Sequence, residues 1–587
     1  MRCVGNIRLL RVIVAVLCAY AGLGYRTADA SWLSQTMGEK SIYSLNKVEE
    51  ASDDAISVRL YKNGVFETVN YKLSLKQTIF GDELGDASSE LGVYLLSGYK
   101  VDVVSKYFNS DVTGRYAATS TPKNVEGAFV GLNTPYKSGN YAVGSAIYNW
   151  GKKTGITTID GIFIGNYIEE ASKPLVWGGA ISLRQSNTES ISGDFIGNYS
   201  KAGNDNEGTG GAIAFAGAKA GEITGNFIGN YVSGGGAYGG AIYGANAVVI
   251  DNINANFIGN HAISDDGTAS AGAIEVNWNT EVKNIKGDFV ANYTNGGGSG
   301  RGGAIGILGT IGKISGDFVG NYAKSLENKA LGGAVAVYWE NRGGMTIVPS
   351  FDNIEGNFIK NYAEGKLFAK GGAIHIGLLG GDVKANFVSN YVKSSDGKAG
   401  GGAVSIDDVE VVMNGETHKS GMGVIEGDFV DNSAVGKVLA QGGALEILGK
   451  LKGLVSDFYG NYAHSKEGEA KGGAIYLEGD IENSVQGSFV GNYAVSEEGE
   501  AKGGAAWTIK DMKFVADARE MVVAGNYTMS NGVRDDNAFW VDDENVKLDF
   551  ELKNGGSLLL SDNFDGVRGY DVNLWVIIRM KYFCLMI

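Results

Sequence analysis

Proline and cysteine are both scarce in this sequence. Only 4 of the 587 residues are proline, although 91 are glycine, so the glycine does not belong to a disordered linker rich in both residues. The three cysteines are Cys3, Cys18 and Cys584, and the first two lie in a predicted signal peptide. No disulfide can therefore form within the mature chain, and we expect its stability to come from a packed core.

Positive charge and histidine are also in short supply. The chain carries 50 Lys and Arg against 66 Asp and Glu, a formal net charge of −16, which argues against nucleic acid or anionic lipid as the main partner. The four histidines, His261, His375, His418 and His464, show no zinc-ligand spacing. The glycine-rich runs lack the Lys-Ser/Thr of a phosphate loop. The sequence therefore predicts no metal and no cofactor.

A repeated pattern dominates what is present. A Phe followed three residues later by Asn recurs eleven times at intervals of about 30 residues, with two wider gaps, and Gly-Gly-Ala-Ile/Val/Leu or a close variant follows each pair. This period is typical of a solenoid. The pairs are Phe163 and Asn166, Phe195 and Asn198, Phe227 and Asn230, Phe257 and Asn260, Phe289 and Asn292, Phe318 and Asn321, Phe358 and Asn361, Phe387 and Asn390, Phe429 and Asn432, Phe458 and Asn461, and Phe489 and Asn492.

Side-chain parity within one repeat predicts two strands. In Ile314-Ser-Gly-Asp-Phe318 the aliphatic, small and aromatic residues alternate with polar ones, so one face of a strand is apolar. A second alternating strand follows the double glycine, as in Ile374-His-Ile376. Because His375 alternates with two inward-facing Ile residues, it should point away from the core. Between the two strands we expect only a short polar loop.

Two corners join these strands. The Asn has the wrong parity for the face that carries the Phe, so the chain must bend there, and stacked copies are expected to form an amide ladder. The Gly-Gly pair, free of Cβ atoms, suits a second tight corner. The pattern indicates an all-β fold, a right-handed parallel β-helix (β-solenoid) in which each coil pairs only with its neighbours.

The paired motifs resemble the repeat of the polymorphic outer-membrane proteins, a family of autotransporter adhesins. In this sequence the resemblance extends from Phe195-Ile-Gly-Asn198 with Gly210-Gly-Ala-Ile213 to Phe489-Val-Gly-Asn492 with Gly503-Gly-Ala-Ala506, and it covers residues 120 to 530. It implies a β-helical passenger that acts in adhesion at the cell surface or outer membrane of a Gram-negative bacterium, or in secreted form. It also implies an outer-membrane β-barrel after the passenger, which this sequence does not show.

The remaining segments complete the predicted organisation. Residues 1–30 read as a signal peptide, with an apolar run closed by Ala28-Asp-Ala30. Residues 31–120 lack the repeat and are expected to cap the solenoid. Residues 121–530 form about twelve repeats, counting a degenerate first one at Phe129. In residues 531–587 the pattern decays toward an apolar, basic end, which favours a truncated chain.

Two classes of function are compatible with this pattern. The first is an exported, adhesin-like surface protein that binds a host cell, matrix or neighbouring cell, or associates with itself. The second is a carbohydrate-active enzyme, a polysaccharide lyase or hydrolase, since the same fold carries such activities. The acidic pairs Asp265-Asp266, Asp407-Asp408 and Asp535-Asp536 have no accompanying Gly-His-Gly or Arg-x-Lys element. We therefore interpret them as solvated loop residues and expect no enzyme.

Two features suggest where a partner binds. Insertions after the Gly-Gly strands at Gly332 and Gly401 leave the same corner two coils apart, and they carry the candidate ligand residues Trp339, Arg342, His418 and Lys419. The alternative is that both insertions are tolerated without a role. In addition, Ile or Val follows the Phe in ten of the eleven repeats. That row is either a second core row, which we favour, or an exposed apolar strip.

Overall fold

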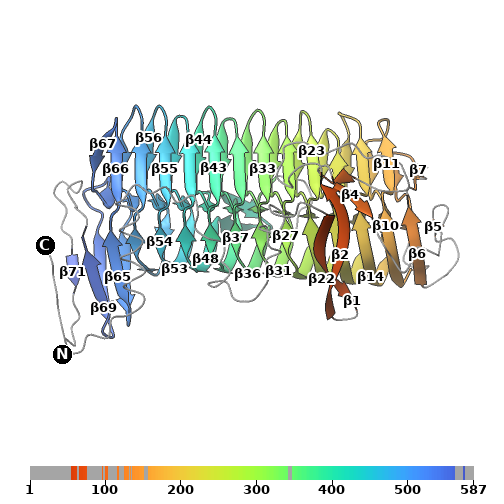
Figure 1. Ribbon diagram of the computed structural model, residues 1–587, viewed down its shortest axis with the longest axis horizontal. Coiled ribbons are helices and arrows are strands. Elements are labelled where there is room, and N and C mark those ends of the chain that lie inside the picture. Colours follow the sequence, from red (N-terminus) through yellow and green to blue (C-terminus); the bar gives the residue numbers. More distant parts are fainter. Residues whose placement is uncertain are drawn as a thin grey trace.

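The computed structural model describes residues 156–340 and 347–561 without a break, most of residues 124–150, and strands at 54–62, 65–75, 95–96, 99–102, 116–117 and 573–575. Every regular element among these residues is a β-strand. The strands stack as a parallel β-solenoid of about 13 turns, drawn lengthwise in Figure 1. The fold class predicted from the repeat is therefore confirmed, while the predicted signal peptide lies outside the described residues.

One turn of the solenoid shows how a repeat is built. It runs through β31 (Thr310–Ser315) and β32 (Phe318–Val319), then β33 (Tyr322–Ser325), β34 (Lys329–Leu331) and β35 (Val335–Val337). Copies of these strands pair in register with the turns before and after. They form four long sheets, which we call sheet I (β31 and β32), sheet II (β33), sheet III (β34) and sheet IV (β35).

The main core lies between sheets I and IV. The Phe of every repeat is fully buried there, together with the aliphatic residues that parity placed on the same face, such as Ile314 and Val335. The rings from Phe129 to Phe489 stack on one another, with Phe318 4.7 Å from both Phe289 and Phe358. One ring per turn thus fills the centre of the solenoid, as the sequence predicted.

Both predicted corners are present. The Asn side chains are fully buried and form a continuous amide ladder: Nδ2 of Asn321 donates to Oδ1 of Asn361 at 3.0 Å. At the second corner Gly332 has φ +63°, which only glycine adopts without strain. A Cβ on Gly333 would lie 2.1 Å from the carbonyl oxygen of Gly372 on the next turn. The double glycine therefore serves both the turn and the close stacking of turns.

The predicted short polar loop between Asn and Gly-Gly is wrong. Two strands occupy this stretch in every central turn, and they form sheets II and III in the upper half of Figure 1. Their facing sides are closed by fully buried small residues such as Ala323 and Ala330, which form a thin core of their own. We call this two-sheet projection the arm. Alanine allows the two sheets to approach closely. The sequence analysis missed these strands because small inward residues give only a weak apolar pattern.

The row of Ile and Val residues after the Phe forms a second buried row, which is the arrangement that the sequence analysis favoured. These side chains lie outside the main core, yet most of them are buried. Val319, Ile359 and Val388 pack along one another, with Val430 against them, as a separate apolar column. The row is therefore mostly shielded from water without joining the central core.

The two ends differ from the middle. At the start, β6 (Asn124–Val130) pairs in register with β10 (Thr158–Ile164), so the degenerate first repeat at Phe129 is a true turn. Before it, β1 (Asp54–Lys62), β2 (Val65–Leu75), β3 (Leu95–Leu96) and β4 (Tyr99–Asp102) form an antiparallel sheet. Its capping role stays a prediction. At the other end, β65 (Glu520–Ala524) and β69 (Leu548–Lys553) continue sheet I beyond the last Phe-x-x-Asn repeat.

Candidate functional site

Exposed apolar side chains concentrate in the middle of the solenoid. Six large hydrophobic residues in the described part of the chain are strongly exposed, and five of them lie between residues 318 and 447. We call these four turns the central coils. Four of the five are at the outer edge of the arm, and the fifth, Val412, is 70% exposed on an inserted segment. An exposed apolar cluster on a soluble surface is typical of an interaction site.

The four residues at the arm edge form a patch, which we call the tip patch. It consists of Leu326 at 63% exposure, Leu367 and Phe368 at 41% each, and Val438 at 47%. Leu326 and the Leu367-Phe368 pair lie on adjacent turns, since the amide of Leu367 donates to the carbonyl of Asn328. Val438 lies two turns beyond Leu367, past the polar turn of residues 395–398. Sequence analysis missed it because the arm was taken for a polar loop.

The two insertions leave the same corner, as predicted. They follow β35 and β45 (Val404–Ile406), which are separated by β40 (Ile374–Ile376) alone. The second insertion is an antiparallel hairpin of β46 (Glu410–Met413) and β47 (Glu416–Lys419). His418 is half-buried on this hairpin, and Nζ of Lys419 lies 2.9 Å from Oε2 of Glu410. The candidate residues of the second insertion thus stand on a structured element, a hairpin whose Val411 and Met413 side chains are buried.

The described start of the first insertion, residues 338–340, packs on the solenoid. Trp339 is half-buried against the outer face of sheet IV, where it packs with Tyr338 and Leu308. Glu340 forms an ion pair with Arg301, whose guanidinium lies 4.8 Å from the centre of the Tyr338 ring. The predicted ligand residue Arg342 lies outside the described residues. Trp339 therefore helps to anchor the insertion.

A buried carboxyl group holds the same insertion. The Glu275 side chain is 1% exposed and accepts hydrogen bonds from Ser270, Asn277 and the Tyr338 hydroxyl. Space for it comes from Gly306 on the next turn, where a Cβ would lie 2.2 Å from Oε2 of Glu275. Burial raises the pKa of Glu275 to about 7, although the hydrogen bonds from Tyr338 and Ser270 lower it. The hydrogen bond between Tyr338 and Glu275 thus joins two turns that are separated by one other turn.

A second polar cluster lies beside the base of the hairpin. Nζ of Lys370 is 2.7 Å from Oδ1 of Asp407 and 3.3 Å from Oε2 of Glu446, which also accepts from Ser405 at 2.6 Å. Nε2 of His375 lies 3.5 Å from Asp407. Burial lowers the pKa of His375 to about 4 although Asp407 raises it, so the ring is neutral at pH 7. Burial also opposes the charge on Lys370, but Glu446 and Asp407 outweigh it and raise the pKa of the lysine.

This cluster corrects two sequence-based interpretations. Asp407 is not a solvated loop residue, because it is paired with Lys370. His375 does lie outside the main core, as parity required, but it is 1% exposed. Glu446 is 2% exposed, and its Oε2 contacts both Lys370 and Ser405. The arrangement therefore stabilises the junction between arm and solenoid and offers little surface to a substrate. The expectation that the protein is not an enzyme stays a prediction.

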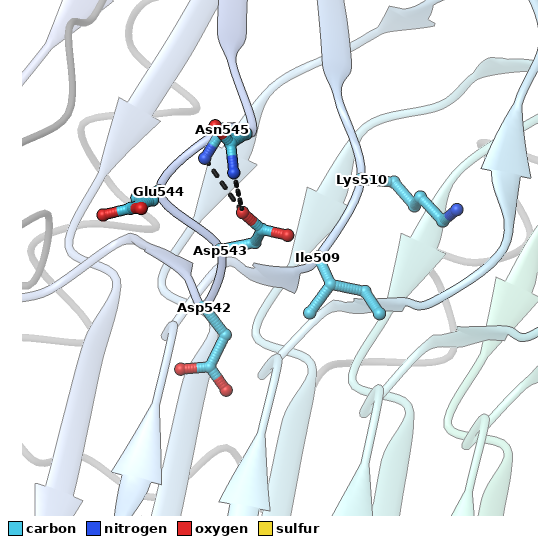
Figure 2. A pocket seen from close by; sticks show the side chains of 6 residues that line it. All are labelled: Ile509, Lys510, Asp542, Asp543, Glu544 and Asn545. Carbon is cyan, nitrogen blue, oxygen red and sulfur yellow. Dashed lines mark hydrogen bonds between the residues drawn. The ribbon is translucent and has the colours of Figure 1, made fainter.

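Three further acidic residues, Asp542, Asp543 and Glu544, lie together at an open surface hollow. A hollow near the last turns is lined by Ile509, Lys510 and residues 542–545, and Figure 2 shows the Asp543 carboxylate bound to the amide and side chain of Asn545. These hydrogen bonds lower the pKa of Asp543. Residues 542–545 are all exposed. Across the described residues no group of three or more His, Cys, Asp or Glu side chains is arranged to hold a metal ion.

The architecture defines the class of the protein: a parallel β-solenoid with a two-sheet arm and insertions at one corner. No family model matches the chain, and neither a curated protein nor a solved structure matches it. In the part of the chain that the structure describes, no helix is long and apolar enough to cross a membrane.

Proposed function

We propose that this protein is an exported, adhesin-like autotransporter passenger whose central coils attach it to a protein on a host cell, in the extracellular matrix or on a neighbouring cell. One observation carries the proposal: the tip patch and both insertions lie on the same four turns of a rigid scaffold. Interaction surfaces are commonly built from apolar side chains and loops on such scaffolds. The resemblance of the repeats to autotransporter adhesins supports export and attachment.

Two changes remove the second insertion and the tip patch and leave the residues of the main core in place. In the first, Glu410–Lys419 is replaced by an Asn-Gly turn, which suits a short connection because the amide of Ser420 donates to the carbonyl of Val409 at 2.8 Å. In the second, all four residues of the tip patch become serine. Val533→Ser is the control, since Val533 is 70% exposed and lies outside the central coils.

Beads coated with the chain from residue 31 onward are incubated with cultured epithelial cells or with immobilised matrix proteins. We expect the wild type and Val533→Ser to attach, and at least one of the two central-coil variants to lose most of its attachment. Circular dichroism confirms that each variant is folded. Attachment by both folded variants at the wild-type level would contradict the proposed role of the central coils, and absence of attachment by the wild type would contradict the proposed function itself.

A further inference from the structure

A ladder of stacked rings runs along sheet II, at the residue that follows each Asn of the amide ladder. Neighbouring rings are 4.6 to 5.1 Å apart between centroids. One member is a histidine, His261, which stacks between Tyr231 and Tyr293 and so keeps a ring in the column. The members are Tyr167, Tyr199, Tyr231, His261, Tyr293, Tyr322, Tyr362, Tyr391, Tyr462, Tyr493 and Tyr527.

The ladder misses one ring, at Ser433. Ser433 pairs in register with Tyr391 on one side and Tyr462 on the other. The turns beneath it are regular, because the Phe429 ring stacks on both neighbouring Phe rings at 4.6 and 5.0 Å. The amide ladder also continues, with Nδ2 of Asn432 donating to Asn461 at 2.9 Å. The missing ring is therefore a local feature of the ladder in the central coils, and Ser433 itself, between the two flanking turns, is 6% exposed.

Tyr391 and Tyr462 flank Ser433, and each is held in place by contacts on the face that points away from Ser433. Tyr391 stacks on Tyr362 at 4.7 Å, and its hydroxyl donates to Glu364 on the same preceding turn at 3.1 Å. Tyr462 stacks on Tyr493 at 5.0 Å with an angle of 4° between the ring planes. Strands two apart are separated by about 9.6 Å. One planar group at the level of Ser433 would lie about 4.8 Å from each ring, within the usual range for stacked π systems.

A carboxylate lies at the corner just before this position and leans toward the turn that carries Tyr462. Asp431 precedes Ser433 by two residues at the corner, is exposed, and has φ 54°. Its Oδ1 leans over Gly460, where a Cβ would lie 2.6 Å away, two residues before Tyr462. Neighbouring protein atoms partly desolvate this carboxyl group and raise its pKa to about 6. The group is therefore ionised at pH 7.5.

We propose that the position at Ser433 binds a planar cation, the guanidinium group of an arginine side chain, between Tyr391 and Tyr462 and beside Asp431. A guanidinium is flat and delocalised, stacks on aromatic faces and pairs with a carboxylate through two N–H groups. An ammonium group has the same charge but cannot stack in this way. The proposal rests on the proposed function in one respect, since the arginine would belong to the attached protein.

The test uses the full chain at pH 7.5 and two probes, N-acetyl-arginine amide and N-acetyl-lysine amide, at millimolar concentrations in saturation-transfer difference NMR. Ser433→Tyr fills the position with the missing ring, Ser433→Ala leaves it open as the matched control, and Asp431→Asn removes the charge. We expect saturable binding of the arginine probe to wild type and Ser433→Ala, at least threefold weaker binding of the lysine probe, and loss of binding in Ser433→Tyr. Asp431→Asn should weaken arginine binding severalfold.

Several results would overturn the proposal. They are binding of the arginine probe by Ser433→Tyr at the wild-type affinity, equal affinity for the two probes, an unchanged affinity in Asp431→Asn, or no saturable binding to the wild type. Ser433→Tyr should also unfold at the wild-type temperature or above, because its ring would complete the ladder. A variant that unfolds or misfolds would show that no ring-sized space exists. Attachment of beads to cells is measured separately, so either idea can fail alone.

Discussion

The side chains of Asn321 and Asn361 belong to adjacent turns and are joined by a buried hydrogen bond of 3.0 Å, from Nδ2 of the first to Oδ1 of the second. Asn321 also donates to the carbonyl of Phe289 at 2.8 Å, and its Oδ1 accepts from the amide of Asn292 at 2.9 Å. One amide side chain thus satisfies backbone groups on the preceding turn and links the turns on both sides.

The first prediction follows from these contacts. Asn321→Leu keeps the approximate volume but leaves the buried amide of Asn292 and carbonyl of Phe289 without partners, at a cost of about 1–3 kcal/mol for each group. We expect faster hydrogen exchange in the turns of Phe289, Phe318 and Phe358, and unchanged exchange near Phe195, because each turn contacts only its neighbours. Hydrogen exchange with mass spectrometry measures this.

The matched control is Asn204→Leu at an exposed turn, which should leave protection unchanged everywhere. Loss of protection along the whole solenoid in Asn321→Leu would contradict the local character of the ladder. So would full protection in the turns beside the substitution.

The core of this fold was predictable from the sequence because its determinants repeat. Phe and Asn recur in every turn at fixed spacing, and parity alone places the Phe inward and the Asn at a corner. The arm was not predictable in the same way. Its short strands turn only small residues inward, such as Ala323 and Ala330, so the alternation of large apolar and polar residues that marks a half-buried strand is almost absent.

The candidate site was predictable in position but not in detail. The lengths of the two insertions located them at one corner. The bond from the Tyr338 hydroxyl to Glu275, however, joins residues 63 positions apart and depends on which side chains cross from one turn to another. The gap at Ser433 was visible in the sequence as a Ser in place of the usual Tyr after Asn432, but its meaning needed the stacked rings on either side.

The second prediction concerns the buried ion pairs of Lys370. Removing one partner of a buried pair leaves an uncompensated charge, which costs about 3–5 kcal/mol. Lys370→Met would leave both Asp407 and Glu446 without their cation. We expect a lower midpoint of urea unfolding and faster hydrogen exchange in the strands around Asp407.

Lys384→Met is the control for this experiment. Lys384 pairs with Glu426 at 3.1 Å, but both side chains are more than half exposed, and exposed pairs contribute about 0–1 kcal/mol. Its unfolding midpoint should stay close to that of the wild type. Equal effects of the two substitutions would show that burial does not strengthen the Lys370 pairs.

The last prediction is a dependence on pH that comes from Glu275. Burial raises the pKa of this carboxyl from the ordinary 4.5 to about 7 in the folded chain, so folding favours the protonated form. The stability that this group contributes is present in full below pH 4.5 and is lost as the pH rises through about 7. Because burial disfavours the ionised carboxylate that Tyr338 contacts, we expect the first insertion to loosen over this interval.

The measurement is the unfolding temperature of wild type and Glu275→Gln at steps from pH 4.5 to 8, with hydrogen exchange of β35 and Tyr338 recorded at both ends. Glutamine has a similar shape and does not titrate, so the other titrating groups contribute equally to both chains. We expect the difference, wild type minus Glu275→Gln, to fall as the pH rises and to become constant above about pH 8, one unit beyond the pKa. A difference that does not change with pH would show that Glu275 keeps its ordinary pKa on folding.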